Sequence, residues 1–180
     1  MRVNAKSIFS LASFRKAISI NPTEGLLKLG DLYKEKKEYD LAIEQYKKAL
    51  ELDTTLSIAY YHIGLVHYEK KDYDKAINSF LKVTQYYKGH DLLNGKTRYL
   101  KYGSPYITLG TTYFLKGNQQ LYAVSNAKGY LIQGNLETAL SWLEKAAVAG
   151  YDISSDSFFN EELKDSEEFK ALLKKYPKKN

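Results

Sequence analysis

The sequence contains no cysteine, one tryptophan, one methionine and three prolines among its 180 residues. The absence of cysteine excludes disulfide bonds and any zinc or iron–sulfur site built on thiolates. No apolar run approaches the roughly 18 residues that a membrane-spanning helix requires. These absences predict a chain without covalent cross-links, without thiolate metal centres and without a membrane span.

Acidic residues are also missing from residues 1–23, which carry the basic residues Arg2, Lys6, Arg15 and Lys16. Because Arg15 and Lys16 interrupt the apolar stretch, this segment does not have the form of a secretory signal, and we expect a cytoplasmic protein. The same composition is typical of an amphipathic transit peptide, which stays an open alternative. The competing interpretation is that residues 1–22 are one helix of the array described below.

The rest of the composition is that of a soluble globular chain, with 44% hydrophobic and 27% charged residues. The 27 basic and 21 acidic residues give a formal net charge of +6, a modest excess. Tyrosine is the abundant aromatic residue, with 17 copies. Most of these rings are expected between helices, where a large ring buries much area while its hydroxyl reaches water.

Internal repetition is the strongest signal in the chain. Residues 35–43 read EKKEYDLAI and residues 69–77 read EKKDYDKAI, so the two segments are identical at seven of nine positions. The two segments start 34 residues apart, and this distance is the length of one repeat. A repeat of this length indicates an array of short helical units, each of which buries its apolar face against its neighbours.

Each unit is expected to contain two helices. In the first helix, residues 26, 29, 30 and 33 have the spacing of one helix face, and residues 60, 63, 64 and 67 repeat it. In the second helix, Ala42, Tyr46 and Ala49 recur as Ala76, Phe80 and Val83. Small residues are needed where two helices cross closely, because only glycine or alanine lets the backbones approach.

This pattern resembles the tetratricopeptide repeat over residues 23–90. The signature positions of that family are filled by Leu29, Gly30, Tyr33, Ala42, Tyr46 and Ala49, and in the next unit by Ile63, Gly64, Ala76 and Phe80. The departures are mild: His67, Val83 and Thr54 stand where Tyr, Ala and Pro are usual, and we expect His67 to be a core substitute for tyrosine. The resemblance implies an all-α fold, an α-α superhelical solenoid of helix pairs.

We predict one continuous domain. Its parts are an orphan repeat helix at residues 1–22, repeats at 23–56 and 57–88, a basic and tyrosine-rich inserted loop at 89–104, an irregular third and fourth repeat at 105–148, a capping helix at 158–173 and a basic tail at 174–180. Within the irregular part, residues 130–135 echo residues 113–118, and Ala127 takes the glycine position of the last unit.

No constellation of residues indicates catalysis, a cofactor or a metal. Residues 94–97 end like a phosphate-binding loop, but His90 stands where that motif needs glycine. His62 and His67 are five positions apart, which is off the spacing that lets one helix face present two metal ligands. The carboxylates fall on faces expected to be solvated. We therefore expect a protein that is not an enzyme.

A binding groove is implied by the resemblance, because the first helices of this family line a concave surface that holds a helix or peptide of a partner protein. The positions next to each packing stripe predict its lining: Leu27, Asp31, Lys34, Ile58, Tyr61, Leu65, Tyr68, Val124, Lys128 and Leu131. This mostly apolar and aromatic lining suits an amphipathic helix or hydrophobic segment. In the alternative interpretation, the inserted loop or the last helix covers Tyr61 and Tyr68.

Members of the family that grip the C-terminal carboxylate of chaperones place charged and amide donors at such positions. Leu27, Asp31 and Leu65 offer no such donors, so a chaperone adaptor is not expected.

Two other kinds of partner stay open. Lys88, Lys96, Arg98 and Lys101 lie among tyrosines and form a basic patch that could bind nucleic acid or an anionic surface. The apolar residues of the N-terminal helix, residues 7–20, could instead stack two copies into a homodimer.

Overall fold

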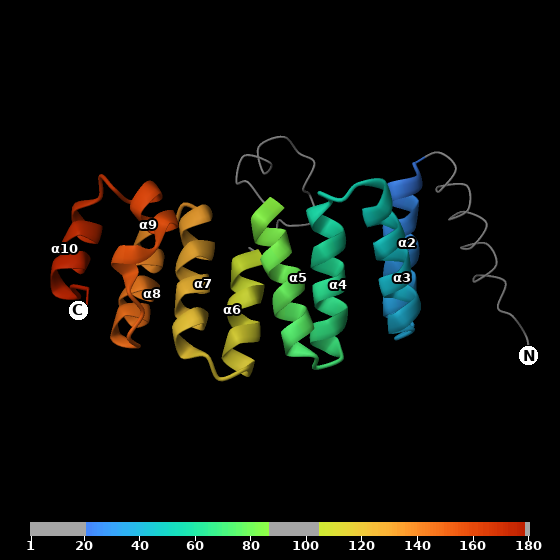
Figure 1. Ribbon diagram of the computed structural model, residues 1–180, viewed down its shortest axis with the longest axis horizontal. Helices are drawn as coiled ribbons and strands as arrows, with labels where there is room; N and C mark the ends of the chain where they lie inside the picture. The colour runs from blue at the N-terminus through green and yellow to red at the C-terminus, as the bar shows by residue number, and fades with distance from the viewer. Residues whose placement is uncertain (1–20, 87–104, 179–180) are drawn as a thin grey trace, which may run out of the picture. The chain divides into compact units, whose positions relative to one another are not determined.

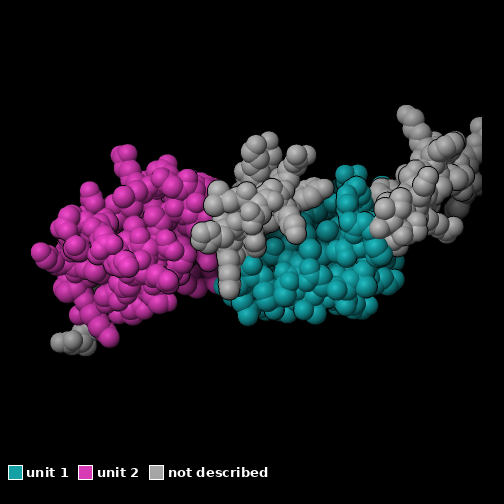
Figure 2. All heavy atoms as spheres, turned by 90° about the horizontal axis from the view of Figure 1, so that it is seen from above, with its two compact units in different colours: residues 1–87 teal, residues 88–180 magenta. Residues whose placement is uncertain are grey.

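The computed structural model describes residues 21–86 and 105–178 (Figure 1). The chain divides into two compact units, Met1–Tyr87 and Lys88–Asn180 (Figure 2), and each is described by itself. The first unit contains α2 (Pro22–Glu35), α3 (Tyr39–Leu52), α4 (Ser57–Glu69) and α5 (Tyr73–Tyr86). The second contains α6 (Pro105–Leu115), α7 (Gln119–Ile132), α8 (Leu136–Val148), the 3-10 helix η3 (Ile153–Ser155), α9 (Ser157–Glu162) and α10 (Glu167–Lys175). All regular structure within the described residues is helical, which confirms the predicted all-α fold of helix pairs.

The same kind of tight turn joins the helices of each pair. In the turn after α2, the amide of Lys37 donates to the carbonyl of Lys34 and the amide of Glu38 donates to the carbonyl of Tyr33. This is the Schellman arrangement, which satisfies the free carbonyls at a helix end and requires a left-handed residue. The left-handed positions of the four turns are Lys37, Lys71, Gly117 and Gly134, with φ of 61°, 61°, 77° and 77°.

A close helix crossing explains the glycines of the first unit. A Cβ added to Gly30 would collide with the ring of Tyr46, and one added to Gly64 would collide with the ring of Phe80. Both rings are fully buried. Each pair is therefore held by one aromatic ring of the second helix lying against the bare backbone of the first.

The second unit departs from this plan at α7, which takes part in two pairs. As the second helix of the α6–α7 pair, it places Asn126 against Gly110, in the position that Tyr46 and Phe80 occupy in the earlier pairs. A tight turn at Gly134 then joins it to α8. The buried Leu143 of α8 follows Ala127 by the same number of residues as Tyr46 follows Gly30. Tight turns of this kind therefore join three consecutive helices, α6, α7 and α8, whereas in the first unit each joins one pair.

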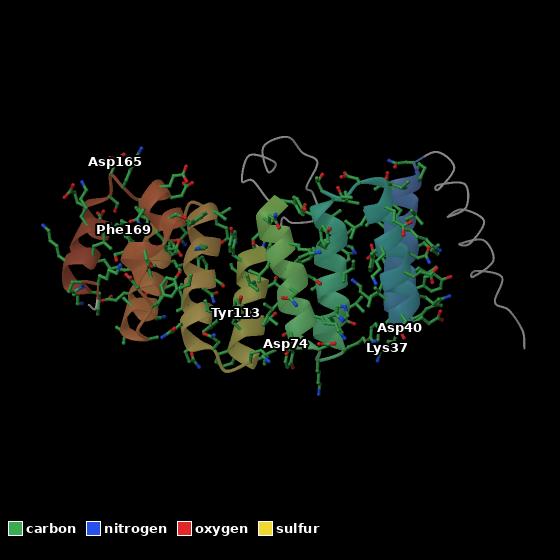
Figure 3. The ribbon with its side chains drawn as sticks, viewed as in Figure 1. Lys37, Asp40, Asp74, Tyr113, Asp165 and Phe169 are labelled. Atoms are coloured by element: carbon green, nitrogen blue, oxygen red, sulfur yellow. The ribbon has the colours of Figure 1, made fainter. Side chains whose placement is uncertain are left out.

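The end of the chain corrects two expectations. The single helix predicted over residues 158–173 is two helices, because Ser166 caps α10 by accepting a hydrogen bond from the amide of Phe169 at 3.2 Å. The predicted basic tail is partly anchored, since Lys175 belongs to α10 and its ammonium lies 2.6 Å from Glu144. Phe159 and Phe169 enter the core of the second unit, so this segment packs against the helices before it. Figure 3 labels Phe169 on α10.

Other expectations fall partly or wholly outside the described residues. Pro22 opens α2 behind the cap Asn21, so the first repeat begins one residue earlier than predicted. The remainder of the orphan helix and the inserted loop at 89–104 lie outside the part of the chain that the structure describes.

Candidate functional site

Seven of the predicted groove residues lie in the first unit, on the first helix of each of its two pairs. α2 and α4 carry these residues, which we call the front face: Leu27, Asp31, Lys34, Ile58, Tyr61, Leu65 and Tyr68. The four members on α4 are three or four positions apart and therefore share one side of that helix. All seven are half-buried, so each is partly supported by the core and partly accessible. Leu27, for example, packs against the cluster around Tyr46 and Ile63.

Asp31 holds three helices together. Its Oδ1 accepts a hydrogen bond from the hydroxyl of Tyr46 on α3 at 2.7 Å and lies 2.5 Å from Nδ1 of His62 on α4. Since a carboxylate is only an acceptor, His62 is assigned the tautomer with the proton on Nδ1. Burial alone would raise the pKa of Asp31, but the hydrogen bonds from His62 and Tyr46 hold it below its ordinary value of 3.8. Oδ1 of Asp31 therefore serves the contacts between the three helices.

The tyrosines of the front face are held by neighbouring rings. Tyr61 lies 5.8 Å from Phe80 between ring centroids, and Tyr68 lies 6.0 Å from Tyr73 in an edge-on arrangement. Such contacts fix the ring planes and reduce the side-chain entropy that a bound partner would have to remove.

The predicted groove residues of α7 do not form an open surface. Val124 is 5% exposed and belongs to the core of the second unit, which corrects its assignment to the groove. The ammonium of Lys128 lies 2.8 Å from the carboxylate of Asp156 and 5.2 and 5.3 Å from the ring centroids of Phe158 and Phe159. Leu131 packs against the same core. The C-terminal segment of the chain itself covers this part of α7.

A second surface of the first unit was not predicted. A pocket of about 390 Å³ lies between α3 and α5 over the back of α4, and we call it the lysine pocket. Its lining is Lys47, Leu50, Tyr60, Ile63, His67, Lys75, Asn78, Ser79 and Lys82. In the sequence, only His67 hints at this pocket, because it replaces the usual tyrosine. The repeat pattern alone explains that replacement as a core substitution.

Several predicted features have no described counterpart. Lys88, Lys96, Arg98 and Lys101 of the basic patch, and the N-terminal helix predicted to form a homodimer, lie outside the described residues. Within residues 21–86 and 105–178, no three side chains of the metal-binding types gather in one place. None of the helices in these ranges is both long and apolar enough to cross a membrane.

Comparison with solved structures finds several similar chains. YrrB, described as a TPR protein with an unusual peptide-binding site, shares 22% identity, with 91% of this chain and 75% of that chain covered at a TM-score of 0.54. MamA shares 21% identity over 81% of this chain and 94% of its own, with a TM-score of 0.48. The N-terminal domain of stress-induced protein-1 from C. elegans shares 17% identity over 88% of this chain and 96% of its own, with a TM-score of 0.40. At these identities, the similarity to YrrB establishes the fold alone.

Comparison with family models locates the repeats in the chain. Residues 30–71 match the family described as TPR repeat, and residues 57–90 match the tetratricopeptide repeat. Comparison with curated protein sequences gives no match. The first match includes the contact of Gly30 with Tyr46, and the second includes the contact of Gly64 with Phe80. Residues 30–90 of the chain therefore belong to the tetratricopeptide-repeat family.

Proposed function

We propose that this chain is a non-catalytic protein-interaction module that binds a helix or apolar peptide segment of a partner on the front face of its first unit. The observation that carries the proposal is the row of half-buried apolar and aromatic side chains along α4: Ile58, Tyr61, Leu65 and Tyr68. YrrB, which has a similar fold, is described as having a peptide-binding site, and this supports a peptide ligand here.

The chemistry of the front face favours an apolar ligand. Oδ1 of Asp31 is engaged by Tyr46 and His62, so this oxygen is already used within the unit. Lys34, whose ammonium lies 3.9 Å from Asp31, is the one cation of the front face. A single lysine does not make the several charged donors that a terminal carboxylate needs. A partner would therefore place apolar side chains on α4 and its polar side toward solvent.

The energetic anchors are expected to be the aromatic residues. Tyr61 and Tyr68 are already oriented by Phe80 and Tyr73, so less ordering is required on binding. Truncation of such an anchor typically costs about 2 kcal/mol or more, which is roughly a thirtyfold loss of affinity.

The absence of cysteine makes a direct test simple, because any introduced cysteine is the sole thiol of this chain. Leu65→Cys on the front face carries a benzophenone-maleimide photo-cross-linker. Leu81→Cys on α5, where the leucine is 43% exposed, is the matched control. After irradiation in host extract, we expect an adduct with one protein from the front-face position that is weak or absent from the control.

The cross-linked peptide of the partner should have apolar residues at helical or alternating spacing. Equal yields from both positions, or adducts from Leu81→Cys alone, would contradict the assignment of binding to the front face. Circular dichroism of both labelled proteins verifies that neither has unfolded.

A further inference from the structure

The lysine pocket lies behind α4 and away from the front face. Tyr60, Ile63 and His67 form its floor, while Tyr61, Leu65 and Tyr68 point to the other side of the same helix. We propose that this pocket binds the phosphate group of an organic phosphate monoester. The inference is independent of the proposed protein binding, because the two surfaces share no residue.

The charge of the pocket is the first argument. Lys47, Lys75 and Lys82 line it, and no carboxylate does. Lys75 is paired with Asp72 at 2.8 Å, whereas Lys47 and Lys82 have no carboxylate partner among the described residues. Lys82 instead lies 5.0 Å above the ring of Tyr60, which keeps its ammonium over the pocket. Two uncompensated ammonium groups facing one concavity favour an anion.

The acidic residues nearby do not neutralise this charge. An adjoining pocket of about 480 Å³ shares Lys47, His67 and Lys75 with the lysine pocket and includes Asp40 and Glu44. Asp40 is bound to Lys70 at 2.9 Å and Glu44 to Lys48 at 2.6 Å. Each of these carboxylates therefore has a cation of its own.

The shape and floor of the pocket indicate the rest of the ligand. A volume of about 390 Å³ is much larger than one phosphate group, and Leu50, Tyr60 and Ile63 supply apolar surface next to the lysines. Asn78 adds a side-chain amide to the lining. A phosphate group among the lysines and an apolar or ring-bearing body against Tyr60 would use both parts of the lining.

His67 provides a reporter inside the site. Its Nδ1 is shielded from solvent and has no hydrogen-bond partner among the described residues. Burial lowers the pKa of His67, and although Asp72 opposes this, the positive charges of Lys75, Lys70 and Lys47 add to it. An anion bound among these lysines would offset their charge, so His67 should titrate at higher pH when the site is filled.

The test is an NMR titration of the histidine rings of the whole chain with phenyl phosphate, inorganic phosphate and phenol. His67→Gln assigns the reporter among the three histidines. We expect saturable shifts of the His67 signals with both phosphates, tighter binding of phenyl phosphate, and no effect of phenol. Lys47→Gln and Lys82→Gln should each weaken binding by about three- to tenfold. Lys28→Gln, which removes one charge from α2 outside the pocket, should leave it unchanged.

Four results would overturn the proposal. These are shifts that do not saturate up to about 10 mM phenyl phosphate, equal weakening by Lys28→Gln and Lys47→Gln, binding of phenol as tight as that of phenyl phosphate, or equal affinities for phenyl and inorganic phosphate. If the site exists, a phosphotyrosine dipeptide separates the two sources of the group. Tighter binding than phenyl phosphate indicates a phosphorylated protein, and equal or weaker binding indicates a free metabolite.

Discussion

Replacing Asp31 should destabilise the first unit more than replacing any other partly or fully exposed Asp or Glu of that unit, because Asp31 joins α2, α3 and α4. In Asp31→Ala, the hydroxyl of the fully buried Tyr46 and Nδ1 of His62, which is 9% exposed, both lose their acceptor. An unsatisfied buried polar group costs about 1–3 kcal/mol, and since the two groups can partly satisfy each other at 3.3 Å, we expect a total of about 2–4 kcal/mol. Asp31→Asn keeps one acceptor oxygen but no charge and should lose about 1–2 kcal/mol.

The effect should also depend on pH in a defined direction. The folded-state pKa of Asp31 is held below its ordinary value of 3.8, so its stabilisation is complete above that value and is lost as pH falls through the folded-state value. The difference between wild type and Asp31→Asn should therefore be largest near neutral pH and shrink in acid. Urea unfolding followed by circular dichroism at several pH values measures it. Asp40→Asn, at an ion pair with a 90% exposed carboxylate, is the control.

A loss below about 0.5 kcal/mol in Asp31→Ala at neutral pH would refute this reasoning, because it would mean that Tyr46 and His62 do not depend on Asp31. So would a difference between wild type and Asp31→Asn that does not change down to pH values well below 3.8. In that case Asp31 would be available to a ligand.

Three further predictions concern stability. Gly64→Ala should cost about 1–3 kcal/mol in thermal or urea unfolding, because the new Cβ collides with the buried ring of Phe80; a neutral result would contradict the close crossing. Lys37→Gly should stabilise by about 0.5–1 kcal/mol, because the left-handed conformation suits glycine; the reverse change, Gly117→Lys, should cost a similar amount, and effects of the opposite sign would count against this account of the turns. Lys128→Met should cost about 3 kcal/mol by leaving Asp156 buried without its cation, and hydrogen exchange should then rise in α9 and α10 rather than in α2 to α5.

The first unit could be predicted largely from the sequence because its physical constraints repeat. A bare glycine opposite a buried ring, a small residue at each crossing and an acidic residue in the first turn of α3 and of α5 recur at one period. The turn repeats as well, since Lys37 and Lys71 both have the left-handed conformation although neither is glycine (Figure 3 labels Lys37).

The second unit was less predictable because one helix satisfies two patterns at once. In α7, Asn126 meets Gly110 and the next residue, Ala127, takes the small position of the following pair, so two registers overlap in one stretch of sequence. The contact by which the C-terminal segment covers Lys128 could not be predicted either. It depends on Asp156, which comes from a segment beyond the end of α8 that has no repeat of its own.

The lysine pocket was missed for a related reason. Lys47, Lys75 and Lys82 are not at equivalent positions of the repeat, and each alone is an ordinary solvated lysine in the sequence. They converge because α3 and α5 both pack on α4. Even His67, which the sequence marked as unusual, indicated a site only once its surroundings were known.

The central claim, that a partner binds to the apolar front face of the first unit, is tested most directly by the affinity of the cross-linked partner segment for three forms of the chain. These are the wild type, Leu65→Asp on the front face and Leu81→Asp on α5. We predict that Leu65→Asp weakens binding by at least tenfold, that Leu81→Asp does not, and that the wild-type affinity changes little between about 0.1 M and about 1 M salt. Unchanged binding by a folded Leu65→Asp, together with a steep loss of affinity in salt, would contradict the claim.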